Sequence, residues 1–255
     1  MRIAIFSDIH GNLPALEAVL HDIKTQYPDQ VYCLGDLVGY ASSPNEVSER
    51  IRSEHVPTVM GNYDDGVGFD RDECGCAYKE AIDRELGQRS LEWTKTQTTE
   101  ENKAFLRTLV PEIRFDVAGV RVLLVHGSPR KMNEYLFEDR AISSFQRLAA
   151  SSNADVIVFG HTHVPYTKTV DGVLFVNVGS VGKPKDGNPR ACYAVFEFAG
   201  DMPPAVTFRR LDYDIAEAAA GIRRSELPHK FARDIELGGA SESPAGTAAA
   251  VDPSA

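Results

Sequence analysis

The chain has 255 residues, 43% hydrophobic and 25% charged, a balance that is typical of a globular protein with a sizeable core and excludes disorder of the whole chain. Its 27 lysines and arginines against 37 aspartates and glutamates give a net charge of -10. That sign argues against general attraction to nucleic-acid phosphates or anionic membranes, so an anionic substrate would need local cations or metal ions. No apolar run approaches the ~18 residues that cross a bilayer, and we expect a cytoplasmic protein with no membrane segment.

The first sixty residues alternate between strand and helix patterns. An apolar, β-branched run at 2–6 predicts a strand, and Asn12 is expected to cap a helix whose apolar residues recur at helical spacing. A second unit follows, with a strand at 31–34, a helix at 45–54 and a strand at 58–60. This alternation predicts a parallel sheet with right-handed crossovers.

The segment 64–111 is polar and charged, and it is predicted to be a helical insertion that caps the domain. Helices are expected at 76–87 and 100–109, the second opened by a Thr98-x-x-Glu101 capping box. Because the segment follows a strand end directly, it is a candidate lid that shapes substrate choice.

The second half of the sequence is expected to be largely antiparallel. Ala118-Gly119 and Asp171-Gly172 each separate two consecutive strand patterns and are typical of short hairpin turns. Helices are expected at 139–150 and 214–223. Strand patterns occur at 113–117, 120–125, 155–159, 166–170, 173–178, 191–198 and 205–209.

The chain is expected to form a single domain over residues 1–237. Residues 238–255 are rich in Gly, Ala, Ser and Pro, which bury too little surface to offset the entropy of ordering, so a disordered tail is predicted.

Residues able to bind a metal follow the ends of five predicted strands, where the loops of an α/β sheet converge. They are Asp8, His10, Asp36, Asn62, His126, His161 and His163. The set combines oxygen and nitrogen donors without a thiolate, which suits manganese, iron, nickel or zinc. A pair of cysteines, Cys74 and Cys76, is a weak C-x-C pattern that fits either exposed loop thiols or part of a metal site.

These blocks resemble the ordered motifs of the calcineurin-like metallophosphoesterases, in particular the small bacterial branch of predicted phosphodiesterases. The motifs are Asp8-Ile9-His10, Gly35-Asp36, Gly61-Asn62, His126 and Gly160-His161-Thr162-His163, and the resemblance runs from Met1 to about Phe198. It implies a mixed α/β fold, a four-layer αββα sandwich of two mixed sheets, with a binuclear metal site at one edge.

The resemblance also implies roles for these residues. Asp8, His10 and His163 would hold the first divalent ion, Asn62, His126 and His161 the second, and Asp36 would bridge both; manganese is favoured. Two such ions clamp a phosphoryl group and lower the pKa of a bridging water to give hydroxide. The catalytic set would then be Asp36, Asn62, Tyr63 and His126.

One position departs from the family pattern, which most often reads Gly-Asn-His-Asp where this chain has Gly61-Asn62-Tyr63-Asp64. The histidine thought to protonate the leaving group is therefore absent. A phenol with a pKa near ~10 is a poor general acid at neutral pH, so Tyr63 either orients substrate or packs at the cleft rim. This change favours diesters whose leaving group needs little protonation.

Two further residues are candidates for substrate binding. Asn12 either caps its helix or contacts phosphate, and Arg130 lies four residues past His126, close enough to bind a non-bridging oxygen or else part of a solvated basic loop. The acidic run that starts at Asp64 is interpreted as a solvated loop.

The predicted function is a divalent-metal-dependent phosphodiesterase acting on a small phosphate ester. A metal-binding scaffold on the same fold, a nucleotide pyrophosphohydrolase and a phosphomonoesterase are the alternatives. The net charge disfavours nucleic acid as a partner, and a homodimer is left open. The sequence lacks dinucleotide-binding, P-loop, zincin and serine-hydrolase motifs.

Overall fold

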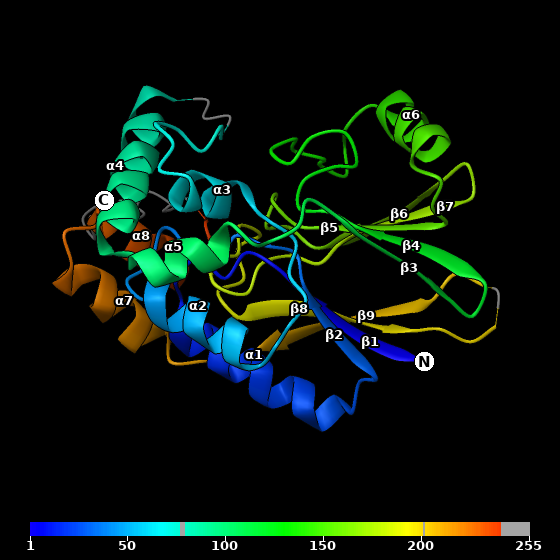
Figure 1. Ribbon diagram of the computed structural model, residues 1–255, viewed down its shortest axis with the longest axis horizontal. Helices are drawn as coiled ribbons and strands as arrows, with labels where there is room; N and C mark the ends of the chain where they lie inside the picture. The colour runs from blue at the N-terminus through cyan, green and yellow to red at the C-terminus, as the bar shows by residue number, and fades with distance from the viewer. Residues whose placement is uncertain (77–79, 201, 241–255) are drawn as a thin grey trace, which may run out of the picture.

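The computed structural model describes residues 1–76, 80–200 and 202–240, and it contains two β-sheets that face each other (Figure 1). The first has the order β2-β1-β8-β9 and the second β3-β4-β5-β7-β6. The strands of the first are β1 (Arg2–Phe6), β2 (Gln30–Cys33), β8 (Ala191–Glu197) and β9 (Ala205–Leu211). Those of the second are β3 (Ile113–Val117), β4 (Val120–Leu124), β5 (Val156–Phe159), β6 (Tyr166–Val170) and β7 (Val173–Asn177).

Both sheets are mixed. β1 and β2 run parallel, whereas β8 is antiparallel to β1 and to β9. In the second sheet β4, β5 and β7 run parallel, and the hairpin partners β3 and β6 are antiparallel at its edges. Both predicted hairpins are confirmed, with positive φ at Ala118, Gly119, Asp171 and Gly172. The prediction that this half is largely antiparallel was wrong for the three central strands.

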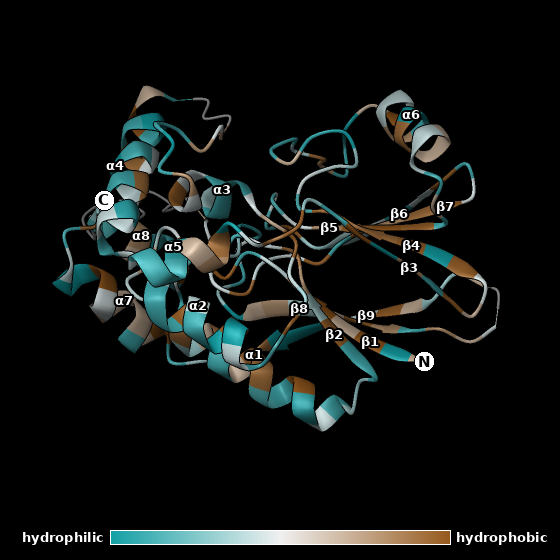
Figure 2. Cartoon of the chain, viewed as in Figure 1, coloured by the Kyte–Doolittle hydropathy of each residue, from teal (hydrophilic) through white to brown (hydrophobic). Residues whose placement is uncertain are grey.

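Successive side chains of β1 point to opposite faces of the first sheet and so belong to two different hydrophobic cores. Ile3 and Ile5 point between the sheets, where they join Val122 and Leu124 of β4, whereas Phe6 packs under the helices on the outer face. In Figure 2 the strands are hydrophobic over much of their length, whereas α2 and α4 are mostly hydrophilic on the visible side. Side chains of β1 are thus buried on both faces of the first sheet.

Helices cover the outer face of each sheet. On the side of the first sheet, α1 (Leu13–Gln26) packs against β8, α2 (Pro44–Ser53) and α7 (Ile215–Arg224) pack against α1, and α8 (His229–Glu236) packs against α7. α6 (Ile142–Ser152) covers the second sheet through Phe145 and Leu148, on the opposite side of the molecule (Figure 1). The four-layer αββα arrangement is as predicted. Within the described residues, no helix combines the length and apolar character needed to cross a bilayer.

The predicted insertion holds α3 (Asn62–Gly68), α4 (Ala81–Gln97) and α5 (Glu100–Leu106). α3 was not predicted, and α4 extends ten residues past the expected end at Gly87 because Leu91 and Thr94 remain buried along its inner face. The predicted start of this helix includes residues 77–79, which lie outside the described residues. The capping prediction was wrong by one position, since Thr99, not Thr98, accepts a hydrogen bond from the N–H of Asn102.

Two other elements differ from the sequence prediction. Residues 58–60 form only two isolated bridges, Cys33 with Thr58 and Val59 with Val110, so they make no third strand. α8 was not expected, although Phe231 and Ile235 bury one of its faces. Of the predicted disordered tail, residues 238–240 continue from α8 with backbone hydrogen bonds, and residues 241–255 lie outside the described chain.

Candidate metal centre

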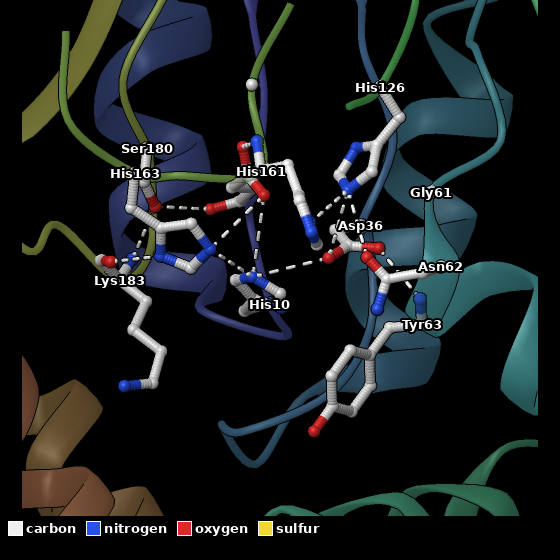
Figure 3. Close-up of polar contacts among 12 residues, drawn as sticks. His10, Asp36, Gly61, Asn62, Tyr63, His126, His161, His163, Ser180 and Lys183 are labelled. Carbon is white, nitrogen blue, oxygen red and sulfur yellow. Dashed lines mark hydrogen bonds and ion pairs between the residues drawn. The ribbon is translucent and has the colours of Figure 1, made fainter. Parts of the chain in front are cut away.

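The seven predicted ligand residues converge at one edge of the sandwich, and each is at most 3% exposed (Figure 3). Asp8 and His10 follow β1 and Asp36 follows β2, so these three come from the first sheet. The second sheet supplies the other histidines, after β4 and β5. Asn62 is the first residue of α3. The site is therefore assembled by both sheets.

The backbone at the ligand positions is held in an unusual conformation. Positive φ values of 55°, 52°, 53°, 64° and 62° occur at Asp8, His10, Asp36, His161 and His163. For residues other than glycine this left-handed region is sparsely populated and costs on the order of 1 kcal/mol or more each. The surrounding packing therefore fixes these side chains independently of anything bound between them.

One group of donor atoms comprises Asp8, His10 and His163. The Nε2 atoms of His10 and His163 are 3.2 Å apart, and Oδ1 of Asp8 is 3.3 Å from Nε2 of His163. This Oδ1 has no hydrogen-bond partner among the described residues, whereas Oδ2 accepts from the N–H of His161 at 2.9 Å. Asp8 thus holds one carboxylate oxygen free for a cation.

A second group comprises Asp36, His126 and His161. Nε2 of His126 lies 3.1 Å from Nδ1 of His161 and 3.4 Å from Oδ2 of Asp36. The same Oδ2 is 3.6 Å from Nε2 of His10, so it stands between the two groups. Asn62 joins the second group, with its Oδ1 3.1 Å from Nε2 of His126.

The tautomers of these histidines show that the donor set fits cations. Nδ1 of His10 donates to the carbonyl of Val38 at 3.1 Å, and Nδ1 of His163 donates to that of Lys183 at 2.5 Å. When both rings are neutral, their Nε2 atoms carry only lone pairs, so two acceptors face each other. A cation between the two Nε2 atoms would accept both lone pairs. The backbone carbonyls that hold Nδ1 are partners of the kind that commonly orient metal-binding histidines.

Electrostatics divide the histidines into two kinds. Burial lowers the pKa of His10 and of His161 to about 3, so both rings are neutral and free to bind metal. Burial also acts to lower the pKa of His126, but the adjacent Asp36 carboxylate outweighs it and raises that pKa to about 10. A cation bound at Nε2 of His126 must therefore replace a proton.

Asp64 is a structural carboxylate that sequence reasoning missed. It is fully buried, and it accepts three backbone N–H groups at 2.8–2.9 Å, from Asp36, Leu37 and Gly61. Burial, with the charge of Asp36 added, raises its pKa to about 7. The interpretation of Asp64 as part of a solvated loop was wrong. The available signal was an acidic residue at the third position of a helix that begins directly after a glycine.

Tyr63 packs behind the cluster. Its side chain is buried, its hydroxyl lies 3.4 Å from the carbonyl oxygen of Gly87, and its ring meets the His10 ring edge-on with centroids 5.6 Å apart. Figure 3 shows the hydroxyl directed away from Asp36 and His126. Of the two roles considered for Tyr63, this geometry favours packing. Its backbone N–H does contact the cluster, donating to Oδ1 of Asp36 at 2.8 Å.

The two candidate substrate-binding residues are engaged elsewhere. Asn12 caps α1 by accepting from the N–H of Ala15, and its amide donates to the carbonyl of Gly182 at 2.9 Å. The Arg130 side chain is 62% exposed and pairs with Glu134. Among the described contacts Arg130 has none with the ligand cluster, so the structure does not bring it there.

A cavity of about 780 Å³ adjoins the cluster. Three of its lining residues touch the histidines. The Tyr40 ring is 4.9 Å from that of His10, the Tyr135 ring is 4.0 Å from that of His161, and the Lys183 carbonyl accepts from His163. The remaining wall carries aromatic rings and charges of both signs, namely Phe137, Phe231, Arg140, Lys185, Lys230, Asp83, Asp139 and Asp234. This cavity is an aromatic approach to the buried ligands in which the four cationic side chains outnumber the acidic ones by one.

Comparison with known proteins agrees with the motifs. A family model described as the calcineurin-like phosphoesterase superfamily domain matches residues 1–201. An uncharacterized protein of Methanocaldococcus jannaschii, MJ0912, is 34% identical over 92% of this chain and 98% of its own. Phosphodiesterase YfcE of Escherichia coli is 28% identical over 77% of this chain and 88% of its own.

A solved structure supports the same assignment. The crystal structure of a metallophosphoesterase from Sphaerobacter thermophilus is 31% identical, covers 93% of this chain and 99% of that one, and superposes with a TM-score of 0.74. The family match covers more than three-quarters of the sequence and includes every residue of the ligand cluster. The chain therefore belongs to the calcineurin-like phosphoesterase superfamily, as its motifs predicted.

Proposed function

We propose that the protein is a divalent-metal-dependent phosphodiesterase that hydrolyses small phosphate esters at a binuclear site. The observation that carries the proposal is the position of Asp36, whose Oδ2 lies 3.6 Å from Nε2 of His10 and 3.4 Å from Nε2 of His126. One carboxylate oxygen thus lies close to histidines of both groups of buried donors. A carboxylate placed in this way supports a pair of ions that act on one phosphoryl group.

The proposal assigns each ligand a place. Asp8, His10 and His163 would hold one ion, Asn62, His126 and His161 would hold the other, and Asp36 would contribute to both. Two divalent ions bound in this way supply charge neutralisation for the phosphoryl group and activation of water at neutral pH. The mixed oxygen and nitrogen donors suit manganese, iron, nickel or zinc, and manganese is the ion that we propose.

Other groups of the chain support diester hydrolysis. Nε2 of His161 is buried without a hydrogen-bond partner among the described residues, so it can donate to a phosphoryl oxygen while Nδ1 binds metal. The buried Tyr63 hydroxyl is directed away from Asp36 and His126, which supports weak protonation of a leaving group by this residue. Esters with a stable leaving anion are therefore the preferred substrates.

The proposal is tested by hydrolysis of bis-p-nitrophenyl phosphate and p-nitrophenyl phosphate, with protein stripped of metal and then reloaded with manganese. We expect manganese to restore turnover and the diester to be hydrolysed faster than the monoester. Metal binding without turnover of either ester would instead favour the metal-binding scaffold. A faster reaction with the monoester, or with a nucleoside diphosphate, would favour a phosphomonoesterase or a pyrophosphohydrolase.

Lys183 is expected to attract the anionic substrate to the cavity. Its side chain is 6% exposed, its ammonium lies 4.8 Å from the centre of the Tyr40 ring, and it extends away from the ligands (Figure 3). Replacing Lys183 with methionine should raise KM for the diester about tenfold, because a buried charge contact is worth roughly 1.5 kcal/mol or more, while kcat changes little. The measurement is steady-state kinetics at fixed ionic strength.

Lys230→Met is the matched control, because it removes the same charge from the same cavity. Lys230 is 52% exposed and pairs with Asp234, as Lys183 does. We expect a change in KM of less than about threefold, in line with a solvent-screened pair. Equal changes in KM for Lys183→Met and Lys230→Met would mean that substrate binding depends only on the net charge of the cavity.

Three expectations stay predictions from the sequence. They are a cytoplasmic location, the possibility of a homodimer, and the expectation that nucleic acid is not a partner.

A further inference from the structure

Two thiols lie against each other beside the second group of ligands. The Sγ atoms of Cys74 and Cys76 are 3.1 Å apart, and both residues are half-buried thiols that are not joined in a disulfide. Gly75 between them has a φ of +69°, and its carbonyl accepts a hydrogen bond from the Asn133 amide at 2.7 Å. The loop is therefore held in place at its middle residue, with the two thiols directed to one side.

Cys76 contacts one of the proposed metal ligands. The Asn62 amide nitrogen Nδ2 donates to Sγ of Cys76 at 3.2 Å, while Oδ1 of the same amide faces Nε2 of His126 at 3.1 Å. An asparagine amide has a donor end and an acceptor end, so an acceptor at Nδ2 determines that Oδ1 faces the ligand cluster. Cys76 is in this sense a positioning residue for Asn62.

We propose that Cys74 and Cys76 form a thiol pair that closes to a disulfide, and that closure weakens the second metal site by releasing Asn62. A disulfide bond is about 2.05 Å long, so the sulfurs need to approach by only about 1 Å. Closure draws Sγ of Cys76 toward Cys74, which disturbs its hydrogen bond with Asn62. The effect on metal rests on the proposed function, whereas closure itself does not.

The chemistry needs an external disulfide oxidant, such as oxidised glutathione. One thiolate attacks the glutathione disulfide, forming a mixed disulfide and releasing one reduced glutathione. The second thiolate then attacks the protein sulfur, forming the Cys74–Cys76 bond and releasing a second reduced glutathione. Two thiols are oxidised and one disulfide is reduced to two thiols, so protons and electrons balance.

The first experiment counts thiols in the full-length protein after incubation with oxidised glutathione. We expect the count in denatured protein to fall from four to two, leaving Cys33 and Cys192, which are buried in strands. Peptide mapping should place the new bond between Cys74 and Cys76, and dithiothreitol should reverse it. A stable mixed disulfide with glutathione, or an unchanged count, would overturn the proposal.

The second experiment measures manganese affinity by calorimetry in reduced and oxidised protein. Loss of an outer partner of a metal ligand typically costs 10–100-fold in affinity, and we expect a loss of about tenfold or more at one of the two sites on oxidation. Unchanged affinity in fully closed protein would show that the thiols do not act on Asn62. Failure of reduced protein to bind two ions would count against the proposed function as well, and the thiol count would still report closure.

Three variants separate the roles of the thiols. Cys74→Ser keeps Cys76 and its hydrogen bond, so it should bind manganese normally and resist oxidation. Cys76→Ser keeps an acceptor for the Asn62 amide and should behave in the same way. Cys76→Ala removes the acceptor and should show the weakened site even when reduced. Normal manganese affinity in Cys76→Ala would refute the positioning role of Cys76.

Discussion

Asp36→Asn is expected to abolish measurable turnover of the diester and to lower the affinity for manganese at both sites. Asparagine has the same shape and can still accept from the N–H of Tyr63, but it lacks the negative charge that stands between His10 and His126. Loss of an outer partner alone costs about 10–100-fold in metal affinity, so loss of a shared ligand should exceed about 100-fold. Metal content after dialysis and kcat/KM on bis-p-nitrophenyl phosphate measure the two effects.

Asp116→Asn provides the control for this prediction. Asp116 lies on β3 in an exposed position, and its replacement removes the same charge without touching the site. Both metal content and turnover should stay at the unsubstituted level. Full activity and two bound ions in Asp36→Asn would contradict the binuclear assignment, since no other described carboxylate lies within 4.0 Å of histidine ring nitrogens from both groups.

Asp64→Ala is expected to produce the largest loss of stability. It leaves the backbone N–H groups of Asp36, Leu37 and Gly61 without their buried acceptor. Each unsatisfied buried group costs about 1–3 kcal/mol, so the free energy of unfolding should fall by roughly 3 kcal/mol or more. Because whole domains are stable by only about 5–15 kcal/mol, urea denaturation should reveal a much lower midpoint.

Two comparisons sharpen the test of Asp64. Asp65→Ala removes the neighbouring carboxylate, which pairs with Arg71 near the surface, and should cost less than about 1 kcal/mol. Asp64→Asn retains one oxygen but turns an amide donor toward a backbone donor. The loss in its free energy of unfolding should therefore lie between those of Asp64→Ala and Asp65→Ala. Similar urea midpoints for Asp64→Ala and Asp65→Ala would show that the three N–H groups find other partners.

The convergence of the ligand residues could be anticipated from sequence for a physical reason. Strand patterns are local, and parallel neighbours bring their carboxyl ends to one edge, so a side chain such as Asp8 or Asp36 can be placed without knowing the packing. The motifs then named the family, and the family implied the two sheets. Strand periodicity alone did not give the parallel centre of the second sheet, because β4, β5 and β7 pair across intervening segments.

Roles that depend on side-chain direction could not be anticipated. Asp64 and Asp65 are adjacent acidic residues in one charged run, yet only Asp64 turns inward, because α3 begins at Asn62 and brings it under three N–H groups. Arg130 is near His126 in the chain but turns to Glu134. Neither residue type nor spacing encodes these directions, which arise from the helix start and from a competing ion pair.

The assembly of each donor group by both sheets has a mechanical consequence. His163 joins Asp8 and His10 across the gap between the sheets, and His126 and His161 meet Asp36 from the opposite side. Ions bound there would act as crosslinks at one rim of the sandwich, where the strands end. At a concentration 100 times its Kd, each ion adds about 2.7 kcal/mol to the folded state. The stability of the contact between the two sheets would thus depend on the concentration of these ions, although the proposed reaction does not consume them.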